Sequence, residues 1–281
     1  MSKPIQSLKP PKNRDLPFFA YGIFKPNQIA YSQIKSYVIN YYECEIPYRM
    51  LMRDGVPLIK SQNGNRHKTM GYLIYFNEES SKKAYEIISE TEPEKLYKWK
   101  EIKIGENKAN VLMGNNPDLG SSYIEIDVGN YNGRDDPFFN EAIILVESEL
   151  EREWKGMRDF DGFFKLQMSY MLLWSSIERY CGLKYNNKGS KINKFSKEKI
   201  FEEKLKKYVT HERKVYSAED LREYTLSPEK PYESIRYYYT IRCNVVHKGK
   251  AMYNDEKILR QSLKELLCIF KELLNETFRS K

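Results

Sequence analysis

The chain has 281 residues, 41% hydrophobic and 14% aromatic, which is enough for one large or two ordinary packed domains. Its net charge of +8 favours polyanionic partners such as nucleic acid, and residues 137–281, with 28 Lys and Arg against 22 Asp and Glu, carry +6 of it. No apolar run approaches the roughly 20 residues of a membrane-spanning helix, so a membrane partner is not expected.

The cysteines are scattered along the chain and form no CxxC pair, and there are only three histidines. This pattern supports neither a disulfide framework nor a zinc site, so we expect no metal and no cofactor. Residues 1–16 are polar and rich in proline, without the apolar core of a signal sequence. We therefore predict a flexible leader over 1–16 and a reduced, cytoplasmic protein.

Residues 17–130 alternate between strand and helix patterns. The segments with strand character are 16–24, which ends in a Tyr-Gly turn, 53–59, 70–76, 97–104, 108–113 and 121–131. Apolar residues at helical spacing predict one helix over 30–41 and a second over 78–92, which Asn77 could cap. We expect an α+β domain over 17–130, built as a small barrel or a curved sheet with two helices.

Residues 136–281 have helical periodicity instead. Asp136-Pro137 is a typical helix start, and Cys181-Gly182 and Gly249 are typical helix ends. The predicted helices cover 138–154, 161–180, 196–209, 232–248 and 255–278. Five such helices predict an all-α bundle, with a domain boundary near 129–137.

The stretch "IRCNVVHKGK" (241–250) places an arginine, an asparagine and a histidine within six positions near a helix end. Asn244 and His247 are three apart and share a helix face, while Arg242 lies to one side and can reach around with its long stem. An arginine on a phosphate beside an imidazole is what metal-free RNA cleavage needs. The alternative is that Arg242 pairs with a nearby acid and His247 caps the helix.

This stretch, late in a helical bundle and before one long helix, resembles the Arg-x4-His motif of HEPN domains (higher eukaryotes and prokaryotes nucleotide-binding). The resemblance implies a homodimer with one metal-independent ribonuclease site, in which Arg242 and His247 are catalytic and Asn244 supports them. Some members of that family are inactive binders. Candidate RNA contacts are the lysines that follow the motif and those of the basic block 184–214, for which a solvated surface is the alternative: Lys248, Lys250, Lys199 and Lys206.

In the first half, "FFAYGIFKPNQ" (18–28), "GYLIYF" (71–76) and 87–104 resemble the γ-glutamylcyclotransferase-like (AIG2-like) domains. The resemblance implies that Glu92 is the general acid/base that shuttles a proton during cyclisation. It also implies a substrate site for a γ-glutamyl compound or another anionic ligand, made of Tyr21, Gly22, Ile23, Phe24 and Tyr97. A solvated carboxylate at a helix end is the alternative for Glu92.

Three functions are therefore open. The first is a HEPN-type endoribonuclease acting on RNA, with a cyclotransferase-like sensor or modifying domain; this combination implies a toxin or antiviral-defence effector. The second is a cyclotransferase that uses its helical domain for dimerisation. The third is a non-catalytic module that binds nucleotides or nucleic acid.

Overall fold

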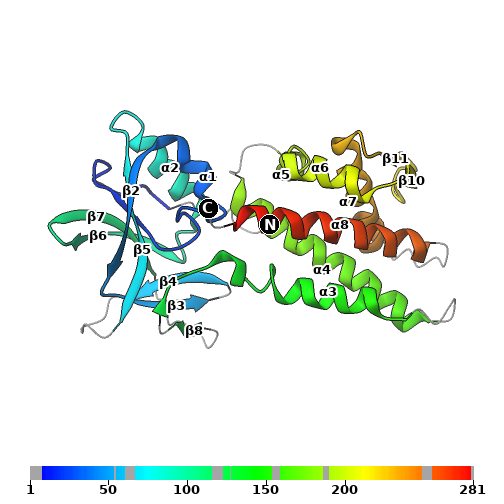
Figure 1. The fold of residues 1–281 in the computed structure, drawn as a ribbon, viewed down its shortest axis with the longest axis horizontal. Coiled ribbons are helices and arrows are strands. Elements are labelled where there is room, and N and C mark those ends of the chain that lie inside the picture. The colour runs from blue at the N-terminus through cyan, green and yellow to red at the C-terminus, as the bar shows by residue number, and fades with distance from the viewer. Residues whose placement is uncertain are drawn as a thin grey trace. The chain divides into compact units, whose positions relative to one another are not determined.

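The computed structural model describes residues 8–53, 55–60, 67–115, 123–126, 128–153, 159–185, 190–248 and 255–279 (Figure 1). For residues 123–126, 128, 247 and 248 it describes the backbone alone. The chain forms two compact units, the first ending at Asp136 and the second containing most of the residues from Pro137 onward.

The first unit is a mixed sheet with several short helical elements. Its main strands are β1 (Phe18–Ala20), β2 (Val38–Ile46), β5 (Lys68–Phe76), β6 (Tyr97–Ile104) and β7 (Asn107–Gly114), in the order β2-β5-β1-β7-β6. Strand β9 (Val128–Gly129) pairs with β5. A smaller sheet contains β4 (Val56–Lys60), β3 (Arg49–Arg53) and β8 (Tyr123–Ile126), in that order. Among the described residues β2 and β6 do not pair with each other, so the sheet is open and the barrel alternative is not realised.

Strand β1 is the centre of this unit because its three residues are buried on both faces. It pairs antiparallel with β5 and parallel with β7. Gly71 allows the close approach of β5: a Cβ at this position would lie 2.5 Å from the carbonyl oxygen of Ala20 and from the ring of Phe19. Helix α2 (Ser81–Thr91) contributes Tyr85, whose hydroxyl donates to Leu16 O at 2.6 Å.

The predicted helix over 30–41 is wrong in its second half. Helix α1 (Tyr31–Ile34) and the 3-10 turn η1 (Lys35–Tyr37) are followed directly by β2. Strand β2 pairs with β5 from Val38 to Ile46, and its β-branched and aromatic residues suit a pleated sheet better than a helix. Helical spacing of a few apolar residues was therefore outweighed by pairing with a distant strand.

The part of the predicted leader that the structure describes, residues 8–16, packs on the first unit. Leu8 is buried, and Asn110 Nδ2 donates to Asn13 O at 2.6 Å. Residues 1–7 lie outside the described residues.

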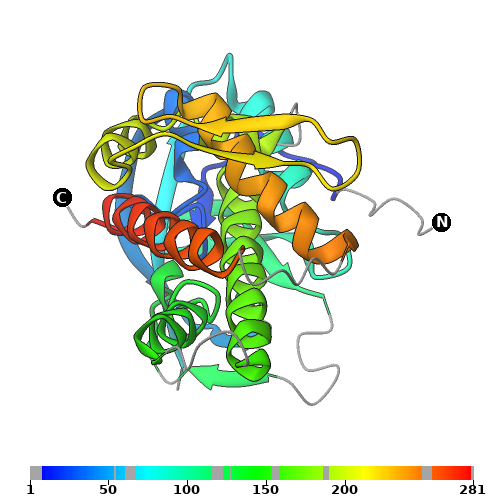
Figure 2. The ribbon, with the colours of Figure 1, turned by 90° about the vertical axis from the view of Figure 1, so that its right-hand side faces the viewer.

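The second unit is mainly helical. Its helices are α3 (Glu141–Glu151), α4 (Phe160–Lys184), α5 (Lys191–Phe195), α6 (Lys199–Tyr208), α7 (Pro231–Lys248) and α8 (Asp255–Thr277), after the 3-10 turn η2 (Gly133–Asp135) at the end of the first unit. The prediction of an all-α unit misses one hairpin, β10 (Arg213–Tyr216) and β11 (Glu223–Leu226), which lies along α7 (Figure 2).

Aromatic side chains fill the core of the second unit. Trp174 and Tyr170 of α4 are fully buried, and the Tyr170 hydroxyl donates to Tyr238 O on α7 at 2.8 Å. The Tyr238 hydroxyl donates to Glu265 on α8, and Arg213 of the hairpin pairs with the same carboxylate. A buried carboxylate with two such partners ties the hairpin, α7 and α8 together.

Candidate functional sites

Glu92 lies just past the end of α2 in the first unit. Its backbone is extended, and its N–H donates to Ile88 O at 3.1 Å, which closes the last turn of the helix. The side chain is 7% exposed, so the alternative of a solvated carboxylate does not hold. No described residue forms a hydrogen bond or ion pair with its carboxyl group, and burial raises its pKa to about 8. Glu92 therefore keeps its proton at neutral pH and can both donate and accept one near pH 8.

The Tyr-Gly loop that follows β1 is tightly folded. Lys25 N–H donates to Gly22 O at 3.1 Å, and Ala30 N–H donates to Ile23 O at 3.0 Å. The N–H groups of Gly22, Ile23 and Phe24 donate to no described residue. Three successive N–H groups of this kind can form a concave anion site, as the sequence predicts for this loop.

The side chains of the loop have structural partners of their own. Ile23 and Phe24 are buried, and the Phe24 ring packs edge-on against Phe18. The hydroxyl of Tyr21 donates to Leu112 O at 2.8 Å, and burial together with the nearby charge of Glu92 raises the pKa of this tyrosine. Tyr21 and Glu92 are thus close enough to interact electrostatically, and the backbone of Ile23 and Phe24, rather than their side chains, is what a ligand could use.

Tyr97 joins the same region through the small sheet. Its hydroxyl donates to Pro57 O at 2.7 Å, and a Cβ on Gly22 would lie 3.0 Å from Pro57 Cγ. Tyr97 and Gly22 therefore share Pro57 as a neighbour, while Tyr21 lies near Glu92. Glycine at position 22 leaves room for this contact.

Lys25 is a charged residue of this loop that the sequence analysis did not select. It is buried, its Nζ donates to Asn130 Oδ1 at 2.8 Å, and burial lowers its pKa to about 8. A lysine three residues after Gly22 was the available signal. Since burial of a lysine is not visible in sequence, that signal was too weak to use.

In the second unit, Arg242 lies on α7 with two partners. Its Nη2 is 3.5 Å from Glu178 Oε1 on α4, and its guanidinium is 5.5 Å from the ring centroid of Tyr239. The side chain is 21% exposed, and its Nε is buried with no hydrogen-bond partner among the described residues. The ion pair predicted as the alternative is present. Because Glu178 is well exposed, the pair is weak, and another anion could replace the Glu178 carboxylate.

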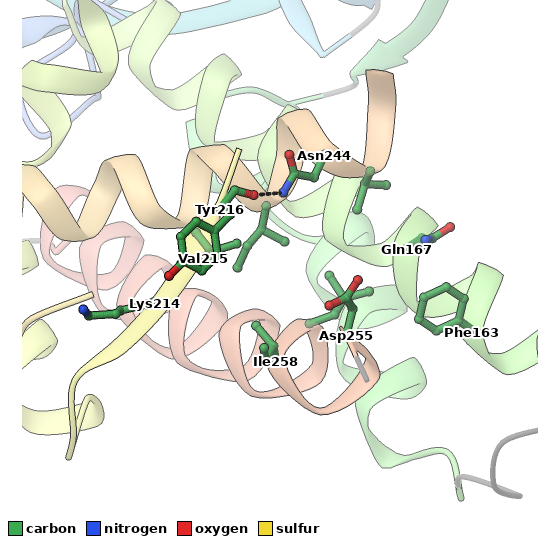
Figure 3. Close-up of a pocket in the computed structure, with 11 residues that line it drawn as sticks. Phe163, Gln167, Lys214, Val215, Tyr216, Asn244, Asp255 and Ile258 are labelled. Carbon is green, nitrogen blue, oxygen red and sulfur yellow. Dashed lines mark hydrogen bonds between the residues drawn. The ribbon is translucent and has the colours of Figure 1, made fainter. Parts of the chain in front are cut away.

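Asn244 holds the hairpin on α7. Its Oδ1 accepts from Ala218 N–H at 2.8 Å, and its Nδ2 donates to Tyr216 O at 2.8 Å. Figure 3 shows the second bond at the edge of a cavity of about 170 Å³. The cavity is lined mainly by apolar side chains, among them Ile241, Val245 and Ile258. Both ends of the amide are occupied, so Asn244 fixes the start of the turn between β10 and β11 against α7.

We expect Asn244→Ala to lower the free energy of unfolding by about 1–3 kcal/mol, because two backbone groups lose their partners. Asn244→Asp should destabilise as well, because a carboxylate facing Tyr216 O cannot donate. Urea unfolding followed by circular dichroism measures both changes. A mutant as stable as the wild type would show that the two bonds contribute nothing.

His247 lies in the last turn of α7, as predicted, but its side chain and that of Lys248 are outside the described residues, as is all of Lys250. The helical register places position 247 one turn beyond Cys243 and Asn244 and about 140° around the helix from Arg242. The backbone alone therefore does not put Arg242 and His247 on one face.

The lysines of the predicted basic block on α6 have acidic partners. Lys199 is 88% exposed and lies 3.6 Å from Glu203. Lys206 is bound by both Glu202, at 3.3 Å, and Glu229, at 3.2 Å, and these bonds raise its pKa. The block is therefore less positive than its lysine content suggests.

For RNA, the partner that the sequence predicts, we expect Lys199→Ala to weaken binding modestly. The slope of log K against log salt should fall by about the amount that one phosphate contact contributes. Lys206→Ala should have a smaller effect, because two carboxylates already neutralise its charge. Filter binding over a salt series measures both slopes. Equal slopes for the wild type and both variants would remove α6 from the RNA contact surface.

The described residues contain no group of three or more His, Cys, Asp or Glu side chains that could hold a metal ion. In the same part of the chain, none of the helices is both long enough and apolar enough to span a bilayer. The described cysteines are all free thiols: Cys44, Cys181, Cys243 and Cys268.

No family model and no curated protein matches the chain. Among solved structures, it is similar to an uncharacterized protein, PH0828, from Pyrococcus horikoshii. That similarity has 16% identity and a TM-score of 0.31, and it covers 49% of this chain and 99% of PH0828.

Proposed function

We propose that the helical unit cleaves RNA without a metal ion and that Arg242 and His247 are its catalytic residues. The observation that carries the proposal is the state of Arg242. Its guanidinium is stacked on Tyr239, its Nε is buried without a described partner, and its ion pair with Glu178 is weak. A phosphate oxygen could take the position of the Glu178 carboxylate and also satisfy the free N–H.

In the proposed reaction, His247 removes the proton of a ribose 2′-hydroxyl, and the resulting oxygen attacks the adjacent phosphorus. The bond from phosphorus to the 5′-oxygen breaks, and that oxygen takes a proton from the protonated His247 of the second copy in the proposed dimer. Arg242 stabilises the charge that develops on the phosphate oxygens. The products are a 2′,3′-cyclic phosphate and a 5′-hydroxyl.

The deciding experiment is cleavage of single-stranded RNA in the presence of EDTA, with analysis of the product ends. We expect cleavage to continue, with cyclic phosphate and 5′-hydroxyl ends, and DNA of the same sequence to resist because it lacks the 2′-hydroxyl. Loss of activity with EDTA, 5′-phosphate products or equal cleavage of DNA would refute the proposal.

The proposal includes a homodimer, because one arginine and one histidine supply only half of an ordinary acid–base site. Two copies of α7 would then face each other and complete it. Sedimentation at micromolar concentration tests this: a monomer with full activity on RNA would exclude the dimer.

A second candidate function is γ-glutamyl cyclotransfer in the first unit, with the helical unit serving for dimerisation. The observation that favours it is that the Glu92 carboxyl group is buried near Tyr21. The loop that follows Tyr21 also has three successive N–H groups that donate to no described residue. Release of 5-oxoproline from γ-glutamyl compounds is the assay. A protein that binds these compounds or RNA and converts neither would be the non-catalytic module.

A further inference from the structure

A pocket of about 420 Å³ lies beside α7 in the helical unit, with walls from α5, β11, α7 and the turn between β10 and β11. The α7 wall is formed by Arg236, Tyr239, Thr240 and Cys243. These positions recur every three or four residues, and position 247 continues the same line one turn further on. The pocket therefore lies along the part of α7 that precedes position 247, the residue proposed to move the proton.

One guanidinium group of this pocket, that of Arg236, contacts two aromatic rings, of which Tyr224 also lines the pocket. The Arg236 guanidinium is 5.1 Å from the ring centroid of Tyr224 and 5.6 Å from that of Tyr232. No described carboxylate pairs with Arg236, so its planar group is held by the rings alone. Unstacked RNA bases bind by stacking on tyrosine rings and on arginine planes of this kind.

The turn between β10 and β11 adds carboxylates to the wall. Asp220 Oδ1 accepts from Arg222 N–H at 3.2 Å and so stabilises the turn. Glu219 also lines the pocket, and no described residue forms a hydrogen bond or ion pair with its carboxylate. The hydrogen bonds of Asn244 to Tyr216 and Ala218 fix this turn against α7. The pocket thus presents a free pair of acceptor oxygens beside its stacking surface.

A free carboxylate distinguishes the four RNA bases by the edge that each presents. Guanine offers two adjacent donors, N1–H and the 2-amino group, which match the two oxygens of a carboxylate. Adenine and cytosine place an amino donor next to a ring-nitrogen acceptor. Uracil places one N–H between two carbonyl groups. In these three bases an acceptor faces the carboxylate, which costs binding energy.

We propose that this pocket binds a guanine base of single-stranded RNA, stacked on Tyr224, Arg236 and Tyr239, with its Watson–Crick edge on Glu219. The role of this base in choosing the cleavage position rests on the proposed ribonuclease function. The binding itself does not.

The test is the binding of GMP, AMP, CMP and UMP to the full chain by calorimetry, since none of these can be cleaved by attack of a 2′-hydroxyl on an internucleotide phosphate. We expect GMP to bind ~10-fold or more tightly than the others. Glu219→Gln should remove this preference, and Glu212→Gln, an exposed carboxylate of the same segment outside the pocket, should leave it unchanged. Tyr224→Ala should weaken the binding of all four nucleotides ~10-fold. Tyr224→Phe keeps the aromatic ring and should therefore keep the binding.

The outcomes separate this inference from the ribonuclease proposal. Selective GMP binding by a protein that cleaves no RNA supports the pocket and refutes the catalytic function. RNA cleavage by a protein that binds the four nucleotides equally, or whose GMP binding survives Glu219→Gln, refutes the pocket alone. When both proposals are right, sequencing of the products places cuts next to guanines, and Glu219→Gln spreads them over all bases.

Discussion

Replacement of His247 by alanine is expected to lower the rate of RNA cleavage by about 10² or more, the usual scale for a general acid–base group. The substitution lies in the last turn of α7, and alanine is a good helix former, so the helix should be kept. RNA binding should therefore remain within a few-fold of the wild type while single-turnover cleavage falls. A variant with wild-type cleavage would exclude His247 as the proton-transfer group.

Arg242 should be equally sensitive, for a different reason. Arg242→Ala removes the charge that stabilises the phosphate, at a cost of about 10²–10³ in rate. Arg242→Lys keeps the charge but loses the planar group over Tyr239 and its several donors, so it should not restore full activity. Glu178→Gln is the matched control: it weakens the ion pair to Arg242, so its activity should not fall.

The limits of α7 could be predicted from sequence because strong local signals bracket the helix. Pro231 stands at its first residue, as expected for a proline at a helix start, and Gly249 follows its last residue, Lys248. The position of Arg242 and Asn244 on this helix could therefore be predicted as well. Their partners could not be predicted, because Glu178 is on another helix and the groups bound by Asn244 belong to a hairpin 26 and 28 residues earlier.

That hairpin was missed because its strands carry little apolar pattern. The residues of β10 are Arg-Lys-Val-Tyr, and those of β11 are Glu-Tyr-Thr-Leu. Their pairing depends on α7 and on the carboxylate of Glu265, which local periodicity does not show. The pocket beside α7 could not be predicted for the same reason, since the turn of this hairpin forms one of its walls.

For Glu92 the sequence left two environments open, a catalytic pocket and a solvated helix end. Burial excludes the solvated helix end, and burial here depends on how α2 is covered by the rest of the unit, which one sequence does not reveal. The catalytic role itself stays a prediction.

We expect Glu92→Gln to keep the fold and to reduce 5-oxoproline release from γ-glutamyl compounds by about 10² or more, because glutamine has nearly the same shape but cannot transfer a proton. In the wild type, kcat/KM should rise with pH and level off above about pH 8, as the buried carboxyl group loses its proton and becomes a base. Undiminished turnover by the variant would show that another group performs the transfer. No turnover by the wild type would leave a domain that only binds.

The same carboxyl group makes a prediction about stability that needs no substrate. Burial raises the pKa of Glu92 from 4.5 to about 8 in the folded protein, so between these values the folded state holds a proton that the unfolded state has lost. This contribution to stability is complete below pH 4.5 and disappears as the pH rises through about 8. The free energy of unfolding of the wild type should therefore fall relative to that of Glu92→Gln, by up to about 1.4 kcal/mol per pH unit in this window. Urea unfolding of both proteins at pH 5, 6.5 and 8.5 measures the difference. If the free energies of unfolding of the two proteins change with pH in parallel, the Glu92 carboxyl group titrates normally and does not exchange protons near pH 8.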